Sequence, residues 1–278
     1  QPDVVWTKEV PLAHVLFHFR QLTGLKYQII FSNGGGFRPE TYCQFDFIHH
    51  LQPEAYDECI AFGIPADKMS VIPNLVPARV CTRNKIELRH EYGLGPEDWV
   101  IVCVAAWNKY HKRIDYLIEE VARLADPNVR LLVCGQPEPD GDSLKALAEE
   151  LMPGRVQFLT LPEDKVIEVL KLSDVFVLPS LYEALGAVVI EAAMAELPII
   201  CHGHAGAKFI LQDGMWLHDL SLPGSLATCL NTMRHKRPSD AQLRSLRDSV
   251  AARFSESKVA ADFTNMVRKV QSQRSVKT

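Results

Sequence analysis

Apolar runs of strand length alternate along the chain with segments in which apolar residues recur at helical spacing. The clearest unit begins at Trp99, where residues 100–104 form an unbroken apolar run typical of a buried parallel strand. Apolar residues then recur on one face of a predicted helix: Ile114, Leu117, Ile118, Val121 and Leu124. The alternation predicts an α/β fold in which helices cover both faces of parallel sheets.

The same alternation continues to residue 201. We expect further strands at 130–135, 155–158, 175–178 and 198–201, and helices at 163–172 and 187–195. Asp142 is expected to cap one more helix, with Leu144, Leu147 and Leu151 facing inward. Together these elements predict one doubly wound domain.

The first 75 or so residues repeat the rhythm in fewer units. Strands are expected at 4–6, 27–31, 45–49 and 69–72, and helices at 14–22 and 53–62. They are typical of the later part of a second Rossmann-like domain. The prolines at 73 and 77 exclude helix and favour a linker. We therefore predict an incomplete N-terminal domain over 1–76 and a C-terminal domain over 77–254, with a basic, polar terminus from Arg268 to Thr278 that is expected to be frayed.

Composition limits the functional classes. A chain of 278 residues with 47% hydrophobic content is long enough for two domains with cores. Its formal net charge of −4 provides no overall field for a polyanion, which argues against binding to a nucleic-acid polymer.

The seven cysteines are odd in number and include no CxxC pair, which favours a reducing, cytoplasmic setting. No apolar stretch approaches the roughly 18 residues that a membrane helix needs. The chain opens with Gln1-Pro2-Asp3 and not with a basic segment before an apolar one. A soluble protein is therefore expected, with peripheral membrane contact left open.

The strongest chemical signal lies in residues 174–193. A predicted strand ends at Pro179, a turn carries Glu183 and Gly186, and a helix begins near Ala187. Free amides at such a helix start point toward the carboxyl ends of the strands, where they favour an anion.

Here the chain resembles the family-4 retaining glycosyltransferases, which have two Rossmann-like domains facing a cleft (the GT-B fold) and a strand-loop-helix element close to PS-x-x-EG-x-G-x-x-x-x-EA. The resemblance implies that Glu183 contacts hydroxyls of the donor sugar and that Glu191 holds the ribose. It also implies that the backbone of residues 184–187 receives the diphosphate and the sugar: Ala184, Leu185, Gly186 and Ala187.

The resemblance extends over nearly the whole chain. Lys112 begins a segment similar to KG-x-x-x-LI, which implies a contact with the donor diphosphate. Strands similar to L-x-I-x-G and V-x-F imply a nucleobase site that involves Gly135, Leu159, Thr160 and Leu161. His204 is a candidate contact on the sugar side, and a closing helix over about 255–272 is expected to return to the first domain.

Three departures qualify the likeness. Trp107 stands where the family has an arginine beside the diphosphate, and Lys109, His111 or Arg113 are the candidate substitutes. Ala184 replaces a glycine and adds a methyl group where backbone approaches ligand. The first strand and glycine-rich turn of the N-terminal domain are missing.

Competing motifs are weaker. Asp140-Gly141-Asp142 imitates a DxD metal motif, but its place before a helix favours a turn and a helix cap. His49-His50 and His202-Gly203-His204 lack a third ligand at a diagnostic spacing.

The resemblance implies transfer of a sugar from a nucleoside diphosphate with retention, with Glu183 and Lys112 at the reacting centre, no resident cofactor and no metal. A UDP-sugar donor is preferred over a GDP-sugar, and the acceptor is open. Two alternatives remain: a nucleotide-sugar-binding protein without catalysis, and one portion of a split enzyme completed by a second chain.

Overall fold

The computed structural model describes residues 2–77, 79–212 and 214–275. They form two compact units, one from the residues up to 76 together with those from 254 onward, and the other from residues 77–253. The sequence interpretation places the second boundary one residue later, after 254. Each unit is built on its own parallel sheet.

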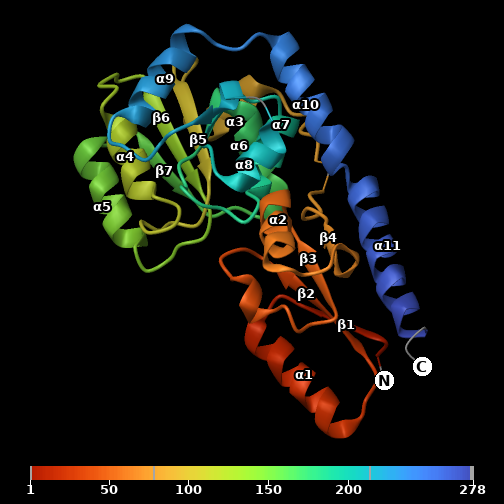
Figure 1. The fold of residues 1–278 in the computed structure, drawn as a ribbon. Helices are drawn as coiled ribbons and strands as arrows, with labels where there is room; N and C mark the ends of the chain where they lie inside the picture. The colour runs from red at the N-terminus through yellow and green to blue at the C-terminus, as the bar shows by residue number, and fades with distance from the viewer. Residues whose placement is uncertain (1, 78, 213, 276–278) are drawn as a thin grey trace. The chain divides into compact units, whose positions relative to one another are not determined.

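The first unit has a four-stranded sheet in the order β1-β2-β3-β4 (Figure 1). Its strands are β1 (Val4–Thr7), β2 (Gln28–Asn33), β3 (Phe47–His50) and β4 (Met69–Val71). Its helices are α1 (Val10–Thr23), α2 (Pro53–Phe62) and α11 (Glu256–Ser275), with 3-10 turns η1 (Pro39–Thr41) and η2 (Ala66–Lys68).

The core of the first unit lies on both sides of this sheet. Ala13 and Cys59, from α1 and α2, join a cluster with Phe31 on one side. On the other side, Val259 and Val270 of α11 pack with the β2 and β3 side chains. The prediction that the terminus is frayed from Arg268 is therefore wrong up to Ser275, because the apolar face of α11 is buried against the sheet. Residues 276–278 lie outside the described residues.

The second unit has a six-stranded parallel sheet in the order β10-β9-β8-β5-β6-β7. Its strands are β5 (Trp99–Val104), β6 (Val129–Cys134), β7 (Val156–Leu159), β8 (Val175–Leu178), β9 (Ile199–His202) and β10 (Leu217–His218). Its helices are α3 (Lys85–Glu91), α4 (Ile114–Ala122), α5 (Gly141–Leu151), α6 (Val166–Leu172), α7 (Ala187–Met194), α8 (Ala205–Leu211), α9 (Ser225–His235) and α10 (Asp240–Phe254), with 3-10 turns η3 (Glu163–Lys165) and η4 (Gly214–Trp216).

Helices lie on both faces of the six-stranded sheet, α4, α5 and α9 on one face and α3, α6, α7 and α8 on the other (Figure 1). Numbered 1 to 6 along the chain, from β5 to β10, these strands lie side by side in the order 3-2-1-4-5-6. The direction in which strands are added therefore reverses between β5 and β8. These two strands pair directly, Ile101 with Val175 and Val102 with Phe176. In doubly wound sheets ligands bind beyond the carboxyl ends of the strands at such a switch point.

The expected strands and helices of both units are present, with shifts of a few residues at their ends. One local prediction is wrong. Asp142 lies inside the first turn of α5, and Asp140 occupies the N-cap position without making a side-chain cap bond. The helices α3, α8, α9 and α10 were not predicted: α3 and α8 have 7 residues each, and α9 and α10 carry only a narrow apolar stripe among polar residues.

Candidate active site

The switch point brings together a lysine and a carboxylate from adjacent strands. Lys112 follows β5 and Glu183 follows β8, and the Lys112 Nζ donates to Glu183 Oε1. Glu183 is 8% exposed. His111 Nε2 lies 3.7 Å from the same carboxylate oxygen and 2.9 Å from the carbonyl oxygen of Tyr182. The two residues predicted at the reacting centre therefore form a largely buried ion pair.

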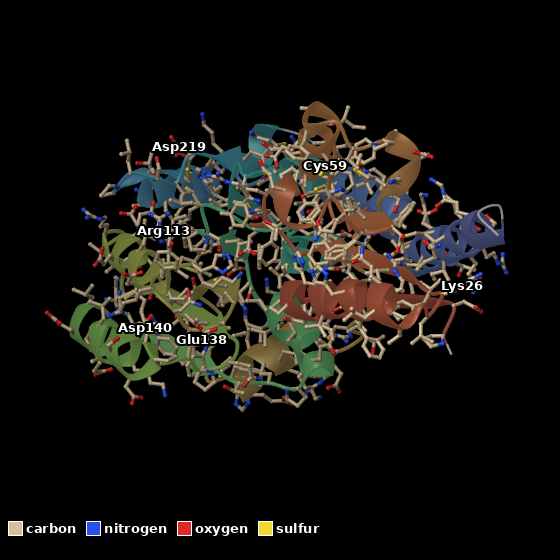
Figure 2. The ribbon with its side chains drawn as sticks, turned by 60° about the horizontal axis from the view of Figure 1, so that its bottom comes forward. Lys26, Cys59, Arg113, Glu138, Asp140 and Asp219 are labelled. Carbon is tan, nitrogen blue, oxygen red and sulfur yellow. The ribbon has the colours of Figure 1, made fainter. Side chains whose placement is uncertain are left out.

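The loop that carries Lys112 is held by the side chains of Asn108 and Asp140, for which the sequence predicted no contact with this loop. Asn108 Oδ1 accepts from the backbone amides of His111 at 3.0 Å and Lys112 at 2.7 Å. Asp140 Oδ2 accepts from the Lys109 amide at 3.0 Å. Figure 2 shows Asp140 beside Glu138 in the turn before α5. Asparagine after a strand is a recognised turn signal and could have been noticed.

Arg113, a candidate substitute for the family arginine, is engaged by protein groups. Its Nη1 donates to the carbonyl oxygens of Pro179 at 3.0 Å and Leu220 at 2.7 Å. The guanidinium carbon lies 3.9 Å from the centroid of the Tyr116 ring. These contacts argue against a direct role of Arg113 toward a donor.

Trp107 was predicted to face the donor, but its side chain lies in the core and is 4% exposed. Its ring packs edge-on against Phe158 at 5.1 Å between centroids, and Lys145 Nζ lies 5.2 Å from it. Such burial leaves no indole surface for a donor contact, so we correct this assignment.

The turn from β8 to α7 positions the remaining predicted groups. Gly186 has a φ of 82° at the N-cap of α7, a conformation that glycine adopts without strain. Leu185 as a whole is 1% exposed, and its backbone packs closely against Gly206. Ala184 is not among the residues with positive φ, so its backbone carries no left-handed strain. The amides of Ala187 and Val188 have no acceptor within the helix, whereas the Val189 amide donates to the Gly186 carbonyl oxygen at 2.8 Å.

His204 was predicted as a contact on the sugar side. The structure gives it a local role, because its Nδ1 accepts from the Ala207 amide at 3.1 Å and caps α8. Burial lowers the pKa of His204 to about 4, although the nearby Glu183 carboxylate raises it. The ring is therefore neutral at pH 7 and packs beside Gly186.

Glu191 lies on α7 and is partly buried. Burial raises the pKa of this carboxyl; Arg79 opposes that shift and Glu163 adds to it. Arg79 itself pairs with Glu163 at 2.9 Å. The Glu191 carbonyl oxygen accepts from the Ala195 amide at 3.0 Å, and within the described residues no hydrogen bond to its carboxylate is seen.

We predict that Glu191→Gln stabilises the ligand-free fold at neutral pH. A carboxyl with a raised pKa holds its proton more tightly when folded, so its contribution favours folding at low pH and is lost as pH rises through the raised pKa. The glutamine side chain is neutral at every pH, so the variant does not lose this contribution to the free energy of unfolding as the pH rises. Thermal unfolding at pH 4 and pH 7 should show a gain in Tm that is larger at pH 7.

The matched control is Glu119→Gln, which changes an exposed carboxylate on α4. A gain at neutral pH that is equal in both variants, or absent from Glu191→Gln, would contradict the prediction.

The residues predicted to face the nucleobase lie where β6 and β7 end. The Gly135 amide donates to the Leu159 carbonyl at 2.9 Å, and the Thr160 hydroxyl donates to the Gly135 carbonyl at 3.0 Å. Leu159 and Leu161 are partly exposed. The structure brings these residues together at the same edge of the sheet as the Lys112–Glu183 pair.

Two features are absent from the described residues, a metal-binding cluster and a membrane-spanning helix. No group of three histidine, cysteine, aspartate or glutamate side chains within them is arranged to hold a metal ion. No helix among them has the length and apolar character needed to cross a bilayer.

Comparison with known sequences points to one family. The family model described as Glycosyl transferases group 1 matches residues 84–244, more than half of the chain. An uncharacterized glycosyltransferase of Methanocaldococcus jannaschii is 29% identical over 180 residues, covering 61% of this chain and 45% of that protein. A D-inositol 3-phosphate glycosyltransferase of Nocardia farcinica is 30% identical over 167 residues, covering 55% of this chain and 36% of that protein. The chain therefore spans less than half the length of these relatives.

Among solved structures, Anabaena HepE in complex with UDP and glucose superposes with a TM-score of 0.81 at 17% identity, covering 96% of this chain and 78% of that one. The sucrose-phosphate synthase of Thermosynechococcus elongatus gives a TM-score of 0.79 at 19% identity, covering 98% and 74%. These matches confirm the predicted fold of two Rossmann-like domains.

Proposed function

Because this chain belongs to the group 1 glycosyl transferases, we propose that it carries the donor site for transfer of a sugar from a nucleoside diphosphate, with retention at the anomeric carbon. The observation that carries the proposal is the buried pairing of Lys112 with Glu183 at the switch point between β5 and β8. A charged pair at the carboxyl edge of a doubly wound sheet is where a phosphorylated ligand is expected.

The proposed chemistry uses these two groups in different ways. As the sugar–phosphate bond breaks, negative charge accumulates on the leaving diphosphate. Lys112 and the first amides of α7 stabilise that charge from positions fixed beforehand. Glu183 accepts hydrogen bonds from sugar hydroxyls. On this scheme the acceptor hydroxyl attacks from the leaving-group face, so no protein nucleophile, resident cofactor or metal is required.

The rest of the donor is assigned by the same logic. Glu191 is a partly buried carboxylate and suits the vicinal hydroxyls of a ribose. The ends of β6 and β7, around Gly135 and Leu159, form the proposed base site. We favour uridine over guanosine, and the complex of the HepE neighbour with UDP and glucose supports this choice.

The cellular location and the partners of the protein are proposed from the cysteines and the sequence alone. All seven cysteines are free thiols, which favours a reducing, cytoplasmic location. The acceptor is not identified, and contribution of a second chain stays a prediction of the sequence. A nucleotide-sugar-binding protein without catalysis is the second candidate, because Trp107 is a core residue where the family motif has a cation.

The proposal predicts that Glu183→Gln reduces release of UDP from UDP-sugars by about 100-fold while UDP binding is retained, because an amide of similar shape loses the charge that orders the sugar hydroxyls. Release of UDP or GDP from a panel of nucleotide sugars, with and without candidate acceptors, measures turnover. Calorimetric titration with UDP and GDP measures binding.

Glu150→Gln, on the exposed side of α5, is the matched control and should behave as the wild type. Turnover by Glu183→Gln at the wild-type rate would remove Glu183 from the site. Donor binding without turnover by the wild type would favour the second candidate.

A further inference from the structure

Arg113 occupies a backbone conformation that its side chain disfavours. Its φ and ψ are 52° and 45°, in the left-handed region, directly before α4. Residues with a Cβ rarely adopt this region unless the surrounding structure holds them there. The segment similar to KG-x-x-x-LI has glycine at this position, so this chain places an arginine where the backbone favours no side chain.

The contacts of the guanidinium explain what holds it. One nitrogen, Nη1, donates to both the Pro179 and the Leu220 carbonyl oxygens, at 3.0 Å and 2.7 Å. The guanidinium also stacks on Tyr116, whose hydroxyl group lies 2.9 Å from the Ser225 hydroxyl group. Arg113 thus reaches from the loop after β5 to the segments that follow β8 and β10.

These tied segments carry the reacting pair. Lys112 directly precedes Arg113, and Pro179 opens the turn that contains Glu183. The Lys112–Glu183 contact closes a ring of interactions between the same two loops. A shift of either loop would change the distance between the ammonium and the carboxylate.

We propose that Arg113 is a positioning residue, which fixes the loop of Lys112 against the loop of Glu183 and acts on the donor only through them. The inference rests on the proposed function. It accounts for the strained backbone, because the two hydrogen bonds of the arginine across the switch point offset the cost of the left-handed conformation, which a glycine would avoid.

Two variants of the full chain test the proposal. Arg113→Gly relieves the backbone and removes the tie; Arg113→Lys keeps the charge but loses the planar guanidinium that stacks on the Tyr116 ring. We expect kcat with the best UDP-sugar to fall about 10- to 100-fold in both, since small misplacements of reacting groups cost that much. UDP affinity, measured by calorimetry, should stay at the wild-type value.

Ala125→Gly is the matched control for backbone strain. Ala125 has a φ of 51° and lies just after α4, at the opposite end of that helix from Arg113, so its replacement should leave kcat unchanged. Wild-type kcat in Arg113→Gly would overturn the inference and leave the proposed function standing. Loss of UDP affinity in parallel with kcat would also overturn it, because Arg113 would then contact the donor itself. A wild-type chain that turns over no nucleotide sugar would overturn both.

Discussion

Replacement of Lys112 by methionine is expected to lower turnover of the sugar donor by about 100- to 1,000-fold, the range seen when one preorganised group at a developing charge is removed. Methionine keeps the length and apolar stem of the lysine but cannot donate to the leaving diphosphate. Initial rates of UDP release, together with calorimetric UDP binding, separate a loss of catalysis from a loss of affinity.

The same variant should be less stable than the wild type. Glu183 is buried and would lose the ammonium that neutralises it, at a cost of about 3 kcal/mol in the free energy of unfolding. The double variant Lys112→Met/Glu183→Gln removes both charges. It should recover most of the stability in urea denaturation while staying inactive.

These two outcomes discriminate between roles. Recovery of both stability and turnover in the double variant would show that the pair is structural. Stability restored without turnover is the result expected of groups that act on the donor.

Gly135→Ala is expected to destabilise the second unit by more than about 3 kcal/mol, at or beyond the upper end of ordinary overpacking. A Cβ added at Gly135 would lie 1.9 Å from the Ala105 carbonyl oxygen, a backbone atom that cannot move without displacing β5. The loop that follows β5 leads to Lys112, so donor binding should fall as well. Urea denaturation and calorimetry measure the two effects.

Gly203→Ala provides the control, because the added Cβ would meet no atom closer than 3.9 Å. Near-wild-type stability in this variant would show that the effect at Gly135 comes from the close approach of β5 and not from loss of a glycine as such. Equal stability of both variants would contradict the prediction.

Much of the fold followed from periodicity. The unbroken apolar run at 100–104 and the helical spacing after Ile114 predicted β5 and α4, because buried parallel strands and their covering helices leave a pattern in the sequence itself. The segments that form α9 and α10 carry only a narrow apolar stripe among polar residues, Leu226 and Leu230 in the first and Leu243, Leu246 and Val250 in the second, and were not predicted. Their stability comes from packing, as where Leu226 and Leu230 enter the core of the second unit, and packing is not visible in one sequence.

Some contacts in the site could be predicted from the sequence and others could not. The spacing of Glu183 and Gly186 before a helix, and Lys112 after a strand, led to a pair that the structure places in contact. Trp107 and Arg113 were given the wrong surroundings, because residue type does not reveal which way a side chain turns from a loop. Asn108 was missed and Asp140 was expected only in a turn and cap, since each acts on backbone amides of the loop after β5.

The sequence by itself determined the family, the α/β alternation and the identity of the ionisable groups that follow the strands. These properties depend on residue type and spacing, which are local. Only the tertiary structure decided that β5 and β8 are neighbours, that Lys112 reaches Glu183, and that Arg113 donates its hydrogen bonds to backbone carbonyl groups. Lys112 and Glu183 stand 71 positions apart in the chain, and the sheet order that joins them is set by the packing of the whole domain.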